Sequence, residues 1–138
     1  MRIVLDTNVL VSALLNPHGT PARIVDLVLS GAVIVLYDDR ILAEYRDVLA
    51  RPKLRINLLE AAFLLDFIET EGILLSAPPL SIDLPDPDDL PFIEVAAIAS
   101  ADALVTGNAR HFSAASGTLE VPILSPAEFM DLWRTRSG

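Results

Sequence analysis

Runs of consecutive apolar residues alternate along this chain with stretches in which apolar residues recur every three or four positions. A short run that is apolar throughout is typical of a strand buried on both faces, whereas the wider spacing is typical of an amphipathic helix. We therefore expect strands at residues 3–5, 32–37, 73–75 and 103–106, with a short edge strand at 122–124. The expected helices cover residues 9–15, 20–30, 41–50, 58–68 and 92–101, and a last one follows Ser125.

This alternation of strands and helices predicts an α/β fold, in which a mostly parallel sheet carries helices on both faces. A length of 138 residues fits one domain, residues 1–138, with room for a substantial core. The stretch 77–91 is rich in Pro and Asp and is expected to be a loop, and residues 109–121 have no regular pattern.

Polar residues at the starts of the expected helices predict how those helices are capped. Thr7 or Asn8 is expected to cap the first helix, and Asp38 or Asp39 the helix 41–50, because their side chains accept hydrogen bonds from free backbone N–H groups. The stretch 125–128, Ser-Pro-Ala-Glu, has the spacing of a capping box and predicts the start of the last helix.

The helix 58–68 is apolar nearly all round, which predicts burial on two sides. If one face covers the sheet, then Leu59, Phe63 and Phe67 are left for solvent on the other. An exposed apolar patch of that size is uncommon on a lone monomer. We therefore expect this helix to lie at a protein–protein interface.

Composition narrows the possible functions. Hydrophobic residues make up 52% of the chain and charged residues 21%, with a mean hydropathy of +0.48. A net charge of −9 argues against a broad basic surface for nucleic acid. The chain lacks cysteine, which excludes disulfides and thiolate metal sites, and no stretch approaches the roughly 20 apolar residues of a membrane-spanning helix. We expect a cytoplasmic protein without a membrane partner.

Acidic side chains come at or after the ends of several expected strands. Asp6 ends the first expected strand, and Glu44 lies on the helix that follows the second strand. The four-residue stretch 86–89 contains three Asp. Asn108 follows the fourth strand and has the shape of Asp without the charge. Because ligands of open α/β sheets bind at the carboxyl ends of the strands, these groups are candidates for one pocket.

Carboxylates that converge repel one another unless cations lie between them, so this pattern indicates a site for a hard divalent metal. Mg²⁺ or Mn²⁺ fits an all-oxygen set, whereas zinc favours Cys or His, and the chain has only His18 and His111. Two simpler interpretations stay open at this point. Asp6 would merely cap the first helix, and the acids at 86–89 would merely solvate a loop.

The residues resemble the PIN-domain family, and within it the toxin components of type II toxin–antitoxin modules. The likeness covers residues 2 to about 130. It rests on Leu5-Asp6-Thr7-Asn8-Val9-Leu10, Glu44 within residues 41–45, Arg51-Pro52-Lys53, Asp86-Pro87-Asp88-Asp89 with Phe92, and residues 101–108, Ala-Asp-Ala-Leu-Val-Thr-Gly-Asn. The resemblance implies a three-layer α/β/α sandwich and a ribonuclease that uses Mg²⁺ or Mn²⁺ to cleave single-stranded RNA. It also implies an antitoxin partner, and we expect a homodimer.

Position by position, the resemblance assigns the first acid to Asp6, the second to Glu44 and the third to Asp89, with Asp86 and Asp88 as the other possibilities for the third. The fourth acidic position falls on Asn108, a departure that weakens one metal site. The expected catalytic residues are Asp6, Glu44, Asp89 and Asn108, and the expected metal ligands are Asp6, Glu44, Asp89 and Asp86.

The expected substrate contacts are Thr7, Asn8, Thr106, Arg51 and Lys53, although the two basic residues could equally complement a helix dipole. Two other functions stay open on the sequence. One is a PIN fold kept as a binding or regulatory module, inactive without the fourth acid. The other is a magnesium phosphohydrolase with Asp6 as nucleophile, which usually needs a lysine near the phosphate, and Lys53 is the only lysine.

Overall fold

The computed structural model describes residues 1–117 and 119–137, so Thr118 and Gly138 of the predicted domain lie outside the described residues. Its sheet has five strands, paired in parallel in the order β3-β2-β1-β4-β5. The strands are β1 (Arg2–Leu5), β2 (Ile34–Tyr37), β3 (Ile73–Leu74), β4 (Ala103–Val105) and β5 (Ile123–Leu124). The predicted strand near residue 123 is confirmed as an edge strand.

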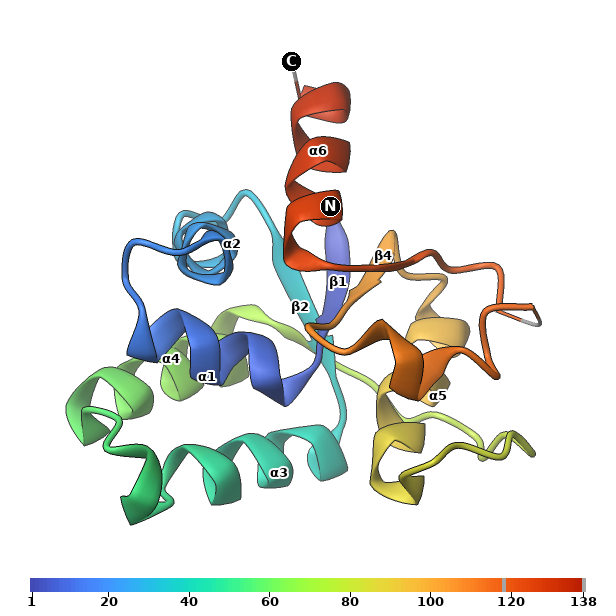
Figure 1. Ribbon diagram of the computed structural model, residues 1–138, viewed down its shortest axis with the longest axis horizontal. Coiled ribbons are helices and arrows are strands. Elements are labelled where there is room, and N and C mark those ends of the chain that lie inside the picture. Colours follow the sequence, from blue (N-terminus) through green and yellow to red (C-terminus); the bar gives the residue numbers. More distant parts are fainter. Residues whose placement is uncertain (118, 138) are drawn as a thin grey trace.

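Helices lie on both sides of this sheet. Figure 1 shows α1, α2 and α4 on one side of β1 and β2, and α5 on the other. The α-helices are α1 (Thr7–Leu15), α2 (Thr20–Leu29), α3 (Asp39–Leu49), α4 (Leu58–Glu71), α5 (Leu90–Ala99) and α6 (Pro126–Ser137), and the 3-10 helices are η1 (Pro52–Leu54), η2 (Pro87–Asp89) and η3 (Ala109–Phe112). The predicted α/β/α sandwich is thereby confirmed. In the chain outside positions 118 and 138, no helix is both long and apolar enough to cross a membrane.

Strand β1 is the centre of the molecule. Ile3, Val4 and Leu5 are all fully buried, because β2 and β4 flank the strand and helices cover both faces. Helix α5 packs across β1, β2 and β4. Consecutive burial of this kind requires apolar side chains at successive positions, which is the pattern seen in the sequence.

Four predicted strands are longer than the observed ones: the predicted ranges 32–37, 73–75, 103–106 and 122–124 are observed as 34–37, 73–74, 103–105 and 123–124. The strand predicted from Ala32 begins at Ile34, because the N–H groups of Ala32 and Val33 both donate to the carbonyl of Leu27 at the end of α2. The strand predicted to reach Leu75 ends at Leu74. The N–H of Leu75 still donates a hydrogen bond to the carbonyl of Tyr37 in β2. Backbone groups used at a helix end are not available to a strand.

The helix starts follow the predicted chemistry with one exception. Asp38 caps α3 by accepting from the N–H of Ile41 at 2.9 Å, and Ser125 and Glu128 exchange the two hydrogen bonds of a capping box before α6. Thr7 and Asn8, however, do not cap the first helix, because both lie inside α1. The N-cap position belongs to the preceding residue, whose side chain makes no capping bond.

The bounds of helices α4 and α5 differ from the predicted ranges. Helix α5 covers Leu90–Ala99 instead of 92–101, because Pro91 starts its first turn and Ser100 turns left-handed with φ of 49°. Helix α4 continues past residue 68 to Glu71. Gly72 then ends it, and any side chain there would meet the carbonyl of Ile68, since a Cβ would lie 2.4 Å from that oxygen.

Helix α4 is buried on one side only. Its buried residues are Ala61, Leu64, Leu65 and Ile68. On the other side, Leu59 is 83% exposed and Phe63 64% exposed, so the expectation of burial on two sides is wrong within this chain. Phe67 is half-buried instead of exposed. The interface that this apolar face suggested stays a prediction.

An ion pair between buried Glu94 and half-exposed Arg40 joins α3 to α5. Glu94 on α5 is almost fully buried and accepts from Arg40 Nη1 at 2.7 Å and from the N–H of Leu80 at 2.6 Å. Arg40, at the start of α3, also donates to Asp38 at 2.8 Å. The guanidinium group therefore connects α3, which carries Glu44, to α5, whose N-cap residue is Asp89.

We expect Arg40→Met to lower the free energy of unfolding by about 2 kcal/mol, because it leaves the Glu94 carboxylate buried without its charged partner. Arg46→Met on the same helix is the matched control, since the Arg46–Glu69 pair is about half exposed on both sides and should contribute less than about 1 kcal/mol. Urea unfolding of both variants measures the difference. Equal losses would show that the Arg40 pair contributes no more than a surface pair.

Candidate active site

Asp6 lies where β1 ends and α1 begins. The register pairs Leu5 with Val105, so Thr106 comes directly beside Asp6 and donates its hydroxyl to Asp6 Oδ2 at 2.8 Å. Asn108 in turn donates its backbone N–H to Thr106 Oγ1 at 3.0 Å. Asp6 is buried, and its carboxylate is held by the neighbouring strand instead of capping α1.

Glu44 comes to the same edge of the sheet from α3. The next residue, Tyr45, is fully buried and donates its hydroxyl to the carbonyl of Leu5 at 2.5 Å. Thr7, directly after Asp6, donates its hydroxyl to Glu44 Oε2. In Figure 1 the helices α1, α3 and α5 surround the ends of β1 and β2, where these contacts lie.

Asp89 joins this group of acids from the junction of η2 and α5. Asp86 begins η2 and accepts from the N–H of Asp88 at 3.0 Å, so part of the acidic stretch does stabilise its own turn. Asp89 differs, because its Oδ2 is buried and accepts no hydrogen bond from any described residue. The Nδ1 atom of His111 lies 3.7 Å from that oxygen.

The pKa values of Asp6, Glu44 and Asp89 are all raised above their ordinary values. Burial raises the pKa of Asp6, and the hydrogen bond from Thr106 opposes the shift. Burial likewise raises the pKa of Glu44, opposed by Thr7. Burial together with the charges of Asp6 and Asp86 raises the pKa of Asp89 to about 6. Acids from distant parts of the sequence are therefore close enough to disfavour one another's ionisation.

The donor set fits a hard divalent cation. As the side chains stand, no three His, Asp or Glu groups in residues 1–117 and 119–137 are arranged to hold one ion, so they would have to rotate. The observation that favours a cation is the buried Asp89 Oδ2, an oxygen without a donor amid carboxylates that repel it. Carboxylate oxygens are the ligands that Mg²⁺ and Mn²⁺ prefer.

Asn108 and His111 lie next to each other on the far side of Asp89. The Asn108 side-chain nitrogen is 3.0 Å from His111 Nε2 and 3.4 Å from Nδ1. His111 falls in the stretch 109–121, which has no regular sequence pattern, and it is not among the predicted site residues. Its signal was the spacing of three from Asn108, which a 3-10 turn such as η3 places on one side.

The other predicted substrate contacts are divided. Asn8 accepts the N–H of Gly107 at 3.1 Å, so its side chain links α1 to the loop after β4. Arg51 lines a groove of about 710 Å³ between α3 and the segment 79–94, together with Glu44 and Asp88. Lys53 lies exposed on η1, and no contact in the described part of the chain joins it to Asp6. The structure thus brings the arginine, but not the lysine, into the groove.

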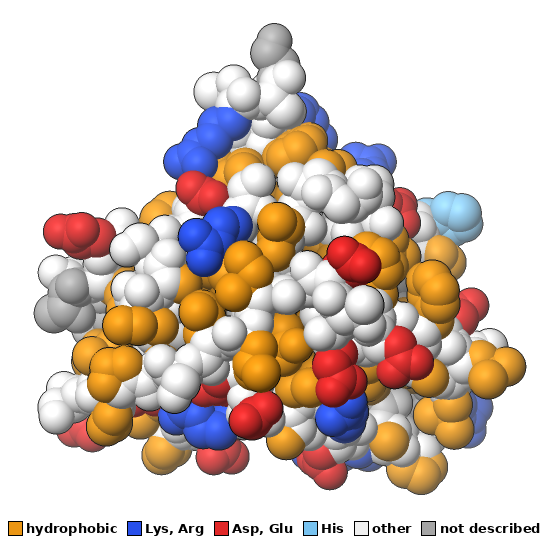
Figure 2. Space-filling view, turned by 180° about the vertical axis from the view of Figure 1, so that it is seen from behind, with side chains coloured by type: hydrophobic (Ala, Val, Ile, Leu, Met, Phe, Trp, Pro, Cys, Tyr) orange, Lys and Arg blue, Asp and Glu red, His pale blue; other side chains and the backbone are white. Residues whose placement is uncertain are grey.

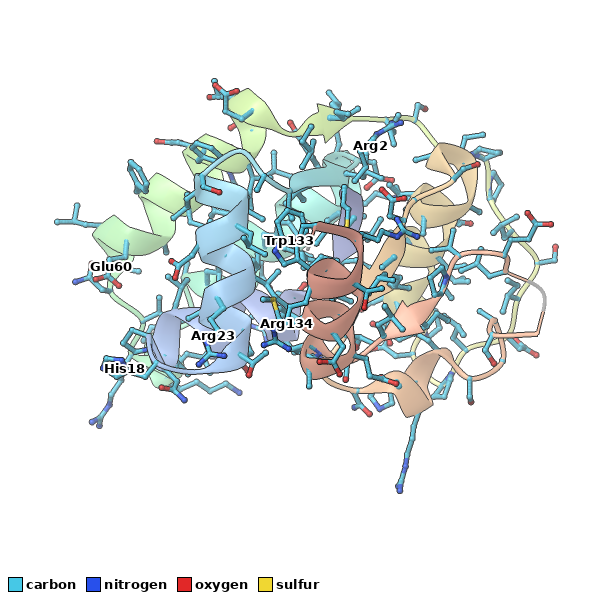
Figure 3. The ribbon with its side chains drawn as sticks, turned by 90° about the horizontal axis from the view of Figure 1, so that it is seen from above. Arg2, His18, Arg23, Glu60, Trp133 and Arg134 are labelled. Atoms are coloured by element: carbon cyan, nitrogen blue, oxygen red, sulfur yellow. The ribbon has the colours of Figure 1, made fainter. Side chains whose placement is uncertain are left out.

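Basic side chains form no continuous band on the face drawn in Figure 2, where Lys and Arg are scattered among Asp and Glu. His18 lies outside the site altogether. Figure 3 shows it near Glu60 of α4, on the turn between α1 and α2 and away from α5.

A family model for the PIN domain matches residues 2–110. The chain therefore belongs to the PIN-domain family, whose members are in general nucleases. The match contains the residues gathered at the ends of β1 and β4 and on α3 and α5.

Two known proteins show further likeness. The uncharacterized protein MJ1680 of Methanocaldococcus jannaschii is 40% identical over 55 residues, which span 40% of this chain and 36% of that protein. A crystal structure of VapBC2 from Rickettsia felis, bound to a DNA fragment from their promoter, aligns with a TM-score of 0.54. That alignment covers 90% of this chain and 97% of the other at 20% identity, so it supports the fold alone.

We expect Asp89→Asn to stabilise the metal-free protein above pH 6 and to have little effect near pH 4. The folded chain holds the Asp89 proton more tightly than the unfolded chain, so the free energy of unfolding falls as pH rises from about 4 through about 6. The neutral amide removes that loss. Denaturant unfolding of both proteins in EDTA between pH 4 and 7 measures it, and a constant difference across this range would contradict the assignment.

Proposed function

We propose that this chain is an endoribonuclease that uses Mg²⁺ or Mn²⁺ to cleave single-stranded RNA, as the toxin of a toxin–antitoxin pair. The observation that carries the proposal is the meeting of Asp6, Glu44 and Asp89 at one edge of the sheet of a PIN domain. Asp86 lies near enough to influence all three and is a further candidate ligand.

The residues of the pocket have separate roles in this proposal. Asp6, Glu44, Asp89 and Asp86 would hold the cation, which when bound activates water and neutralises charge on the phosphodiester. Thr106 orients Asp6, and Thr7 orients Glu44, because each hydroxyl donates to the carboxylate. These hydroxyls keep the carboxylates directed into the pocket.

Substrate enters along the groove beside α3. Arg51 lies in its wall, where it pairs with Asp47 at 3.0 Å and is half exposed, so a phosphate can replace that weak partner. Lys53, also on the flank after α3, would contact RNA farther from the reaction. The walls also include Pro79, Pro87 and Pro91. A net charge of −9 implies that RNA binds weakly until the cation is present.

The phosphohydrolase alternative has less support. It needs a free nucleophilic Asp6 and a lysine beside the phosphate. Asp6 Oδ2 instead accepts from Thr106, and Lys53 is on exposed η1.

The alternative of an inactive binding module rests on Asn108 in place of an acid, and a cleavage assay separates it from the nuclease.

We expect Asp6→Asn to reduce cleavage of short single-stranded RNA in Mn²⁺ at least about 100-fold, the lower end of what a directly acting group contributes. The melting temperature in EDTA should stay equal or rise, because one of the repelling carboxylates is removed. Asp131→Asn, an exposed acid on α6, is the control and should cleave like the original chain.

An original chain that cleaves no RNA in Mn²⁺, or that cleaves equally in EDTA, would contradict the proposed function. Full activity of Asp6→Asn would remove the assignment of the site. A large drop in its metal-free melting temperature would instead make Asp6 a structural residue.

The apolar face of α4 is the proposed partner surface. Leu14, Val25 and Leu29 of α1 and α2 join Leu59 and Phe63 around a groove of about 360 Å³. Leu15 and Leu58, also apolar, are 50% and 65% exposed. The likeness to VapBC2, a toxin–antitoxin complex, supports an antitoxin as the occupant, and a homodimer is the other arrangement that we expected.

We expect Phe63→Ser to prevent binding of an antitoxin co-expressed from a neighbouring reading frame, while RNA cleavage is unchanged. Ile98→Ser on α5 is the control, since Ile98 is also about half exposed but lies on the other side of the sheet. Sedimentation velocity of the chain with and without that protein gives both stoichiometry and the self-association state. A dimer that Phe63→Ser dissociates would make a second copy the occupant, and binding that survives Phe63→Ser would remove this surface.

A further inference from the structure

Asp89 and His111 lie close together, but their nearest polar atoms are too far apart for a hydrogen bond. The Nδ1 to Oδ2 separation is 3.7 Å, and this oxygen has no donor among the described residues. Hydrogen bonds between nitrogen and oxygen are about 2.7–3.2 Å long. Two coordinate bonds of roughly 2.1 Å to a shared cation, however, can span this separation.

Asn108 lies against the imidazole ring. Its side-chain nitrogen is 3.0 Å from His111 Nε2 and 3.4 Å from Nδ1, so it is nearly equidistant from the two ring nitrogens. An atom in this position lies over the ring and limits its rotation by contact. Groups that hold a metal-binding histidine in orientation affect its affinity for the metal.

We propose that His111 is a ligand of the cation held by Asp6, Glu44 and Asp89, through Nδ1, and that Asn108 orients the imidazole instead of binding the cation. This inference rests on the proposed metal-dependent function. It makes the fourth position of the site a nitrogen, supplied three residues after the asparagine that the sequence resemblance selected. Imidazole binds Mn²⁺ better than Mg²⁺, so the site should favour Mn²⁺.

Electron spin-echo spectroscopy of bound Mn²⁺ tests the inference directly, because a coordinated imidazole gives nitrogen modulation and carboxylates do not. We expect nitrogen modulation in the original chain and its loss in His111→Ala. His18→Ala is the matched control and should keep it, since His18 lies on the turn between α1 and α2. Because His111 is exposed, we expect His111→Ala to fold, and circular dichroism checks this.

Calorimetric titration with Mn²⁺ and Mg²⁺ separates the two roles. His111→Ala should weaken Mn²⁺ binding roughly 10–100-fold and Mg²⁺ binding much less. Asn108→Ala should weaken Mn²⁺ about tenfold while nitrogen modulation persists, as expected for a residue that orients a ligand. Nitrogen modulation that persists in His111→Ala, or a Mn²⁺ affinity that His111→Ala leaves unchanged, would overturn the inference.

The outcomes distinguish this inference from the proposed function. Mn²⁺ that binds to the original chain and is lost in Asp6→Asn, but shows no nitrogen modulation, overturns the role of His111 and leaves the metal-dependent nuclease intact. Failure to bind Mn²⁺ at all overturns both. RNA cleavage that needs no metal overturns the proposed function, whatever the spectrum shows.

Discussion

The parallel pairing of β1 with β2 and β4 is the constraint on which the rest of the molecule depends. Parallel strands end at one edge, so the residue after β1 and the residue after β4 are forced to be neighbours. Asp6 therefore meets Thr106 across a single hydrogen bond. The buried hydroxyl of Tyr45 extends this arrangement to α3, because its bond to Leu5 places Glu44 beside the same edge.

Gathering acids at a half-buried edge works against stability, and the structure shows how that strain is limited. Thr7 and Thr106 each donate a hydroxyl to a carboxylate. Arg40 and Glu94 join α3, which carries Glu44, to α5, whose N-cap residue is Asp89. From the described residues, Asp89 accepts no such hydrogen bond at its buried Oδ2. Burial and neighbouring negative charge raise its pKa to about 6. A pocket of this kind favours whatever brings positive charge into it.

The molecule keeps its chemistry and its apolar surface apart. Figure 1 shows α1, α3 and α5 around the ends of β1 and β2, where the acids gather, and α4 beside α1 and α2. Leu59 and Phe63 of α4 are exposed and line a groove with residues of α1 and α2. A partner on the apolar face would therefore bury hydrophobic area without filling the pocket by itself. Apolar burial supplies affinity in proportion to area, and the acidic pocket supplies selectivity for charge.

The sequence by itself determined the architecture, because continuous apolar runs and helical spacing report burial and do not depend on distant residues. Asp6, Glu44 and the acids of the stretch 86–89 were candidates for one site because they follow strands of one parallel sheet, and the family resemblance chose Asp89 among the last group. Only the tertiary structure decided which local bonds form. Asp6 binds Thr106 instead of capping α1, α4 buries one face instead of two, and His111 faces Asp89. These contacts join residues far apart in the chain, whose distances follow from packing and not from local pattern.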